Sequence, residues 1–219
     1  MIRVDNIVKY YGEHLALKGI SYTINKGEIV GFLGPNGAGK STMMRIITGY
    51  LPATSGFVYL DDYEIYDNPI ELKRKIGYMP ENISLYTEMT VIDYLKFAAK
   101  LKGISRKHIK SALENTIEIT GLTKYKDRII GHLSKGYKQR TGIAQAIIHD
   151  PEVLILDEPT SGLDPNQLIE VRSLIKSLGG TRTVILSTHI LSEVEDTCER
   201  ALIIDNGELI AEDTIEGLK

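Results

Sequence analysis

One glycine-rich stretch, residues 34–42, constrains this chain more than any other part of it. It reads Gly34-Pro35-Asn36-Gly37-Ala38-Gly39-Lys40-Ser41-Thr42 and has the spacing G-x-x-x-x-G-K-S. The apolar run 28–33 precedes it, and a helix-competent segment, 42–47, follows it. A strand, a tight turn and a helix start therefore come in the order that a phosphate cradle requires, because glycines allow backbone N–H groups and the positive helix end to face a polyphosphate.

This stretch predicts a nucleotide site that also holds a metal ion. Residues 34–42 are all expected to contact the nucleotide, with Lys40 reaching the β and γ phosphates. The Ser41 hydroxyl is expected to ligate Mg²⁺. The alternative is a structural turn that matches by chance, and it leaves the strand before the turn and the helix after it unexplained.

The bulk properties narrow the class of protein. A chain of 219 residues buries one substantial core, and a net charge of −3 argues against a nucleic-acid partner, which usually requires a basic excess. The apolar runs are only strand-sized, and residues 1–5 show no signal-peptide pattern. The single cysteine, Cys198, excludes an internal disulfide and fits a reducing compartment. We therefore expect a cytoplasmic protein.

Hydrophobic periodicity predicts an α/β fold. Strands are expected within 2–33 and over 56–60, 153–156, 183–187 and 201–204, with a hairpin turn at 205–208. One-sided helices are expected over 168–178 and 191–197. Such alternation favours a parallel sheet that is covered on both faces and binds ligands at the carboxyl ends of its strands.

A mostly helical block interrupts this alternation. Thr90 begins a capping-box-like sequence for a helix that runs to about Leu101, and the apolar spacing over 109–117 predicts a second helix. We predict one domain over 1–219, with an α/β core over about 1–80 and 150–219 and a helical subdomain over about 81–149.

Two adjacent acids end the apolar strand 153–156. Asp157 is expected to hold Mg²⁺ through water, and Glu158 is expected to polarise an attacking water. The alternative is a pair of acids that caps a helix.

The stretch 133–140, Leu-Ser-Lys-Gly-Tyr-Lys-Gln-Arg, resembles the LSGGQ signature motif of the ABC family of ATPases. With 34–42 as Walker A, 153–158 as Walker B, 161–165 as the D-loop and His189 as the switch histidine, the resemblance covers nearly the whole chain in order and spacing. It implies a P-loop NTPase fold of ABC type, with a RecA-like core, an N-terminal antiparallel β subdomain and a helical subdomain.

The resemblance also implies site residues and partners. Two copies, here a homodimer, would close head to tail, so that the signature of one copy faces the ATP held by the cradle of the other. The helix that begins at Ser134 would point its positive end at that nucleotide, although Ser134 by itself is also simply a good N-cap. The catalytic residues implied are Lys40, Glu158 and His189. The signature residues are Leu133, Ser134, Lys135, Gly136 and Tyr137, and the D-loop residues are Ser161, Gly162, Leu163 and Asp164.

Two further positions come from the resemblance. Tyr11 matches the aromatic residue that stacks on adenine, and Tyr10 is the alternative. Glu81 stands where most members carry glutamine, and it is expected to give an oxygen to the metal alongside Ser41 and Asp157. The glutamate and the Lys-Gly-Tyr signature resemble the branch that exports drugs, polysaccharides, ions or lipids.

The sequence thus predicts an ATP-binding and hydrolysing subunit that uses ATP and Mg²⁺ and powers a separate integral membrane permease. It would lie at the inner face of the cell membrane, with residues 82–90 near a helix of the permease. One alternative is an ABC ATPase that acts on DNA or ribosomes, but such relatives usually carry coiled-coil insertions or two cassettes. A small-molecule kinase or GTPase leaves 133–140 unexplained.

Overall fold

The computed structural model describes residues 1–67 and 69–218. The strands are β1 (Ile2–Tyr11), β2 (His14–Ile24), β3 (Ile29–Leu33), β4 (Ser55–Leu60), β5 (Tyr63–Glu64), β6 (Ile76–Met79), β7 (Val153–Asp157), β8 (Thr183–Thr188), β9 (Arg200–Asp205) and β10 (Glu208–Thr214). The α-helices are α1 (Lys40–Ile47), α2 (Pro69–Arg74), α3 (Val91–Leu101), α4 (Arg106–Ile119), α5 (Lys135–Ile147), α6 (Pro165–Leu178) and α7 (Leu191–Thr197). Short 3-10 turns, η1 (Thr123–Tyr125) and η2 (Ile130–His132), join α4 to α5.

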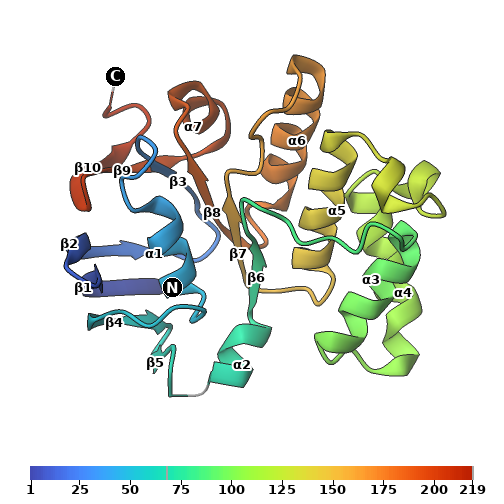
Figure 1. Ribbon diagram of the computed structural model, residues 1–219, viewed down its shortest axis with the longest axis horizontal. Helices are drawn as coiled ribbons and strands as arrows, with labels where there is room; N and C mark the ends of the chain where they lie inside the picture. The colour runs from blue at the N-terminus through green and yellow to red at the C-terminus, as the bar shows by residue number, and fades with distance from the viewer. Residues whose placement is uncertain (68, 219) are drawn as a thin grey trace.

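The central sheet runs β10-β9-β3-β8-β7-β6 (Figure 1). Strands β9, β3, β8, β7 and β6 are parallel, and β10 pairs antiparallel with β9 through the turn at Asn206 and Gly207. The predicted parallel sheet and terminal hairpin are confirmed. Because β3, β7 and β8 are neighbours and run in one direction, the cradle, the acidic pair and His189 all follow strand ends at the same edge.

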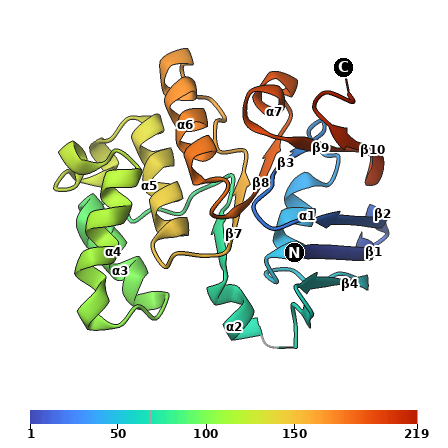
Figure 2. The same ribbon diagram turned by 180° about the vertical axis from the view of Figure 1, so that it is seen from behind.

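A second sheet, of order β2-β1-β4-β5, is antiparallel. Helix α1 lies between the two sheets in both views (Figures 1 and 2). One hydrophobic cluster joins all three layers, with Ile7 and Val58 from the antiparallel sheet, Met43 and Ile46 from α1, and Phe32 from β3. The helix after the cradle is therefore fixed from both sides.

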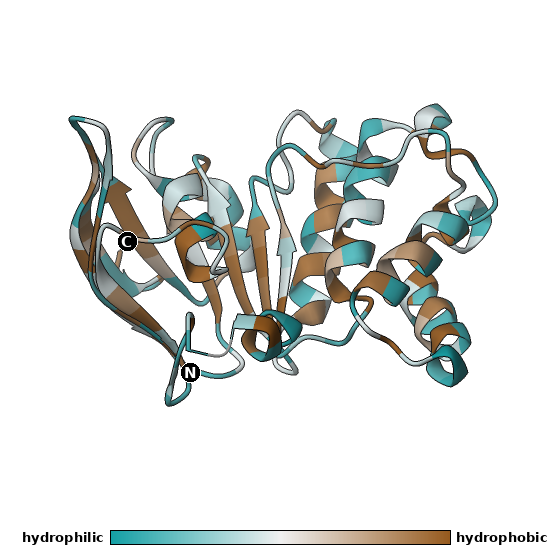
Figure 3. Ribbon diagram, turned by 60° about the horizontal axis from the view of Figure 1, so that its bottom comes forward, coloured by the Kyte–Doolittle hydropathy of each residue, from teal (hydrophilic) through white to brown (hydrophobic). Residues whose placement is uncertain are grey.

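Helices α5, α6 and α7 cover the opposite face of the central sheet. Their buried residues, such as Ile143, Ile175 and Val194, pack with Leu154 and Leu186 of the sheet in a second cluster. In Figure 3 most of the central strands carry the brown of hydrophobic residues. The prediction of a sheet that is covered on both faces is confirmed.

A third cluster holds the helical block together. The predicted amphipathic faces are confirmed, since Leu95 of α3 and Leu113 and Ile117 of α4 are buried against one another. The predicted capping sequence is also confirmed, because Thr90 Oγ1 accepts the backbone N–H of Asp93 at 3.2 Å. The fold is that of a P-loop NTPase, with an antiparallel β unit and a helical unit around the core.

Some predicted boundaries are wrong, since α6 begins at Pro165 rather than 168 and β9 spans Arg200–Asp205 rather than 201–204, and one prediction stays open. Helix α1 begins at Lys40 rather than Thr42, so Lys40 and Ser41 lie in its first turn. The division into subdomains at about 80 and 150 remains a prediction, and Lys219, the last residue of the predicted domain, lies outside the described residues. Among the helices of residues 1–67 and 69–218, none is both long and apolar enough to cross a bilayer.

Candidate functional site

The turn between β3 and α1 has a conformation that requires glycine. Gly39, the N-cap of α1, has a φ of 105°, which lies in the left-handed region. A Cβ at this position would also stand 3.0 Å from the carbonyl oxygen of Ala16 on β2. The chain can therefore enter α1 this close to the antiparallel sheet only with glycine at position 39.

A cavity of about 540 Å³ opens over this turn. It is lined by Tyr11, His14, Ala16, Asn36, Gly37, Gly39, Lys40, Ser41, Thr42, Glu81 and Glu158. Residues 39–42, at the start of α1, are among the lining residues, and the first backbone N–H groups of a helix have no intrahelical acceptors. These donors and this volume suit a polyphosphate, and the binding of the nucleotide by residues 34–42 stays a prediction.

Lys40 is almost fully buried at the bottom of this cavity. Its Nζ donates to the carbonyl oxygens of Gly34 at 2.7 Å and Pro35 at 3.1 Å, and it lies 3.4 Å from Glu158 Oε1. The ammonium group therefore folds back over the turn and reaches the acid at the end of β7. The structure thus brings together the lysine of the first motif and the glutamate of the second.

Glu158 adopts an unusual backbone conformation. Its φ is 49°, in the left-handed region, which costs a non-glycine residue about 1 to 3 kcal/mol. Its N–H is held by β8, where it donates to the carbonyl oxygen of Ser187 at 3.1 Å and to Ser187 Oγ at 3.1 Å. These bonds offset the strain and aim the carboxylate at the cavity.

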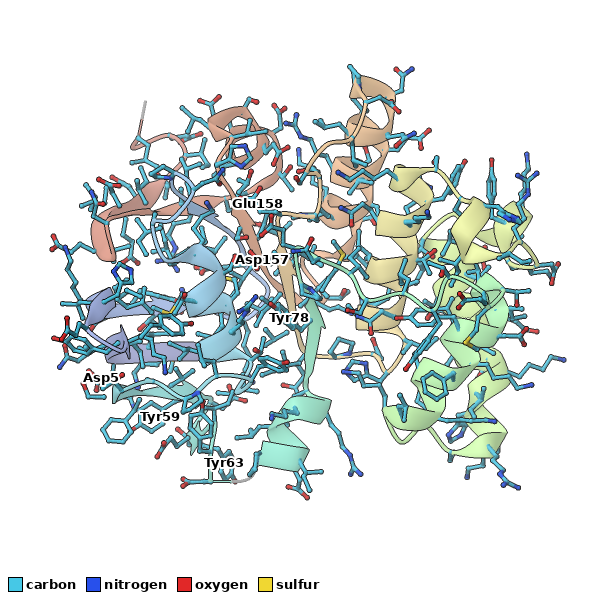
Figure 4. The ribbon with its side chains drawn as sticks, viewed as in Figure 1. Asp5, Tyr59, Tyr63, Tyr78, Asp157 and Glu158 are labelled. Atoms are coloured by element: carbon cyan, nitrogen blue, oxygen red, sulfur yellow. The ribbon has the colours of Figure 1, made fainter. Side chains whose placement is uncertain are left out.

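Asp157 lies beneath Glu158 at the end of β7 (Figure 4). Its side chain is buried, and its Oδ1 accepts a hydrogen bond from the Ser187 hydroxyl. Tyr78, on the neighbouring strand β6, stays neutral, because burial and then the charge of Asp157 raise the pKa of its phenol to about 12. The two adjacent acids therefore differ in their surroundings. The Asp157 side chain is buried in the sheet and bonded to Ser187, whereas the Glu158 side chain borders the cavity.

His189 follows β8 and contacts the same glutamate. Its Nδ1 lies 3.0 Å from Glu158 Oε2 and 3.2 Å from Oε1. Because a carboxylate can only accept, the proton of this bond belongs to Nδ1. Lys40 and His189 therefore hold the Glu158 carboxylate between them, although the three residues come from α1, the end of β7 and the end of β8.

The rim of the cavity carries one predicted aromatic residue and one residue that the sequence did not reveal. Tyr11 lines the cavity. Tyr10 precedes it on β1, and neighbouring strand residues point to opposite faces. His14 also lines the cavity because it pairs with Tyr11 across the β1–β2 hairpin. The sequence does hold a sign of this placement, because His14 follows Tyr11 after only two residues, one of which is Gly12, and such a tight turn sets the two side by side.

The predicted signature lies at the start of α5. Ser134 occupies the N-cap position but makes no side-chain capping bond, so the interpretation of Ser134 as an ordinary capping side chain is wrong. The backbone N–H of Gly136 donates instead to Gln167 Oε1 of α6, at 2.9 Å. The exposed Ser134 hydroxyl is therefore not used by its own helix.

Of the other signature side chains, Leu133 and Tyr137 pack within the helical block, whereas Lys135 lies against the predicted D-loop. Leu133 is buried in the helical cluster, and the ring of Tyr137 stacks on Tyr125 with centroids 3.8 Å apart. Lys135 lies over the predicted D-loop, because a Cβ on Gly162 would collide with its Nζ. The signature and the D-loop thus form one surface within the chain.

The predicted D-loop, residues 161–164, leads into α6. Ser161 N donates to the carbonyl oxygen of Glu158 at 3.2 Å, and Leu163 N donates to that of Thr160 at 3.2 Å. Asp164 is the N-cap of α6, where its side chain accepts the N–H of Gln167 at 3.0 Å. The loop is therefore tied directly to the glutamate at the end of β7.

The predicted metal ligands border the cavity only in part. Ser41 and Glu81 line it, while Asp157 lies in the sheet below. Within the described residues, no three His, Cys, Asp or Glu side chains gather into a metal cage. Mg²⁺ usually keeps several waters and takes only one or two protein ligands beside substrate phosphates, so the residues present fit a magnesium–nucleotide complex.

Comparison with known proteins agrees with this geometry. The ABC transporter family model matches residues 17–161, which include the cradle, the signature and the acidic pair. The chain is 41% identical over 212 residues to the linearmycin resistance ATP-binding protein LnrL of Bacillus subtilis, with 96% of this chain and 68% of LnrL covered.

Two further similarities extend over nearly the whole chain. It is 39% identical over 221 residues to the bacitracin transport ATP-binding protein BcrA of Bacillus licheniformis, with 100% of this chain and 71% of BcrA covered. It also resembles the dimeric ATP-binding cassette MJ0796, solved in a post-hydrolysis state with ADP and Pi, with a TM-score of 0.86, 28% identity and coverage of 98% of this chain and 99% of that one. The family model over residues 17–161, and relatives that match over nearly the whole of this chain, show together with this geometry that the chain belongs to the ABC transporter family as an ATP-binding subunit.

Proposed function

We propose that this protein hydrolyses ATP with Glu158 as the general base and that closure and reopening of a head-to-tail dimer drive a separate membrane protein. One observation carries this proposal. The Glu158 carboxylate lies at the cavity edge, 3.4 Å from the Lys40 ammonium and 3.0 Å from the His189 ring. A carboxylate positioned in this way is suited to take a proton from a water that attacks the terminal phosphate.

Lys40 exchanges partners when ATP binds. In the structure, its charge is satisfied by Glu158 and by the carbonyl oxygens of Gly34 and Pro35. A triphosphate in the cavity would offer the ammonium several charged oxygens in place of one carboxylate at 3.4 Å and two neutral carbonyls, and hydrogen bonds between charged groups are the stronger ones. The move of Lys40 to phosphate frees the Glu158 carboxylate to accept a proton, while His189 keeps it oriented.

The remaining residues of the site bind and orient the nucleotide. The N–H groups of residues 36–42 would surround the phosphates, and Tyr11 would stack on the adenine. Ser41 and Glu81, which line the cavity, would hold Mg²⁺ together with the buried Asp157 below them. When bound, Mg²⁺ neutralises charge that develops on the phosphate oxygens. The protein supplies position and electrostatics for a displacement by water.

The proposed partners are a second copy and a membrane permease. The exposed Ser134 and the start of α5 form the surface offered to the nucleotide of the second copy. The similarity to LnrL and BcrA supports transport as the task, and export of a drug, polysaccharide, ion or lipid is the direction we favour. The protein would then work at the cytoplasmic face of the cell membrane.

Glu158→Gln is the experiment that tests the catalytic assignment. The amide keeps the shape of the side chain but cannot act as a base, so we expect ATP affinity within about threefold of wild type and turnover reduced by at least about a hundredfold. Glu208→Gln, at an exposed carboxylate paired with Lys18, is the matched control and should hydrolyse ATP normally. Hydrolysis by Glu158→Gln within threefold of wild type would remove Glu158 from the role of base.

A further inference from the structure

A buried carboxylate lies outside the cavity, between two segments that flank the proposed catalytic pair. Glu193 of α7 is 1% exposed. Its Oε1 accepts from the Thr160 hydroxyl at 2.7 Å, and its Oε2 accepts from the Thr188 hydroxyl at 2.6 Å. Burial of an ionised carboxylate is costly unless its oxygens are paired, so both bonds are needed to keep this side chain in place.

Each of the two threonines lies close in sequence to one residue of the proposed catalytic pair, Glu158 or His189. Thr160 follows Glu158 by two residues and directly precedes the segment 161–164. Thr188 is the last residue of β8 and directly precedes His189. Its hydroxyl oxygen also accepts the N–H of Ile190 at 3.1 Å, so it holds the backbone on both sides of the histidine. One carboxylate thus connects the segment after Glu158 with the segment that carries His189.

Arg172 of α6 is the cation that lies next to the buried Glu193 carboxylate. Its guanidinium lies 3.7 Å from Glu193 Oε1 and pairs with Asp196 at 2.6 Å. Helices α6 and α7 run side by side in both ribbon views (Figures 1 and 2). The charge of Glu193 is therefore compensated from α6, while its two oxygens remain available to the threonines.

We infer that Glu193 is a positioning residue that holds the His189 ring against the Glu158 carboxylate. This inference rests on the proposed function, because it assigns Glu193 a task in the same hydrolysis. A carboxylate is a rigid group, so acceptance from Thr160 at one oxygen and from Thr188 at the other fixes the separation of the two segments. Movement of the segment 161–164 is transmitted to His189 through this same group.

Glu193→Gln tests the inference, because glutamine keeps the size of the side chain but replaces one acceptor oxygen with a donor amide. We expect kcat to fall by about tenfold or more, while the Kd for ATP, measured with the Glu158→Gln change added to prevent turnover, stays within about threefold. We also expect the NMR signal of the His189 imidazole nitrogens, assigned by its loss in His189→Ala, to shift away from its wild-type position. Asp196→Asn is the matched control, because Asp196 also pairs with Arg172 but accepts no hydrogen bond from Thr160 or Thr188. This variant should change none of these quantities.

Thr188→Val and Thr160→Val provide a second route if Glu193→Gln does not fold. Each removes one hydroxyl from the junction and is expected to lower kcat more than ATP affinity and to shift the His189 signal. A kcat within threefold of wild type, an unchanged His189 signal, or an equal loss of kcat and ATP affinity in the folded variants would overturn the inference. Failure of the proposed function is distinguishable, because wild-type protein would then lack ATPase activity or Glu158→Gln would retain it.

Discussion

The backbone N–H of Gly136 donates a 2.9 Å hydrogen bond to Oε1 of Gln167. Gly136 lies in the first turn of α5 and Gln167 in the first turn of α6. A Cβ on Gly136 would collide with the Gln167 amide, so the close approach depends on glycine. The N–H that is proposed to face the nucleotide of a second copy is thus occupied inside its own chain, and dimer closure must replace this bond.

Gln167→Ala is therefore expected to favour dimerisation. One neutral hydrogen bond contributes about 0.5 to 1.5 kcal/mol, so its removal should lower the ATP concentration needed for half-maximal dimerisation by about 2- to 10-fold. Light scattering during an ATP titration, with both proteins carrying Glu158→Gln, measures this. Asn166→Ala, on the exposed side of the same turn, should leave the midpoint unchanged. A midpoint that is unchanged or higher in Gln167→Ala would show that Gln167 does not compete with the nucleotide.

Lys40→Ala is expected to weaken ATP binding by more than about tenfold, because the ammonium is the proposed cation at the β and γ phosphates. Isothermal titration of the variant with MgATP measures the loss. Lys96→Ala, at an exposed lysine of α3, should bind normally. Wild-type affinity in Lys40→Ala, with an unchanged melting temperature, would contradict the assignment of the cradle.

Tyr11→Ala is expected to reduce ATP affinity by about 5- to 150-fold, which corresponds to about 1 to 3 kcal/mol for base stacking. Tyr11→Phe should retain most of the affinity, because the ring and not the hydroxyl provides the stacking surface. Tyr10→Ala is the matched control, since the two tyrosines have the same exposed fraction, 44%, and only Tyr11 lines the cavity. A larger loss in Tyr10→Ala than in Tyr11→Ala would reassign the base contact.

The sequence predicted those parts of the fold that local periodicity controls. The strand β7 is an uninterrupted apolar run over 153–156, and α4 shows its buried residues at helical spacing, so both were recognisable. The start of α1 was predicted two residues late, because the glycine-rich turn hides the point at which helical geometry begins at Lys40.

Contacts between distant segments of the chain could not be predicted in the same way. The pairing of Gly136 with Gln167 and the junction of Glu193 with Thr160 and Thr188 depend on how α5, α6 and α7 pack on the sheet. No motif spacing encodes such contacts. The sequence predicted only that Lys40 and Glu158 follow strands that end at the same edge of the sheet. The structure adds the distance between the two side chains and the hydrogen bond from His189 to Glu158.

His149 is expected to make stability depend on pH. Burial, with a smaller effect of Lys102, lowers the pKa of this histidine to about 4, and its Nε2 donates to the carbonyl oxygen of Ile76 at 3.2 Å. In the unfolded chain the same ring binds a proton near pH 6.5, so the free energy of unfolding falls as the pH drops from about 6.5 towards 4.

His149→Gln should remove this contribution, which amounts to about 1 kcal/mol at about pH 5 once partial exposure is allowed for. Urea unfolding of wild type and variant at about pH 7.5 and about pH 5 measures the difference. His108→Gln, at an exposed histidine of α4, should keep the wild-type dependence. An identical pH dependence in wild type and His149→Gln would show that His149 is not the titrating group.

The oligomeric state of Glu158→Gln in MgATP tests the central claim most directly. Binding without hydrolysis should trap ATP between the cradle of one copy and the signature of the other, so light scattering should report a dimer in saturating MgATP and a monomer without nucleotide. A protein that binds MgATP yet stays monomeric, even with its membrane partner supplied, would contradict the account.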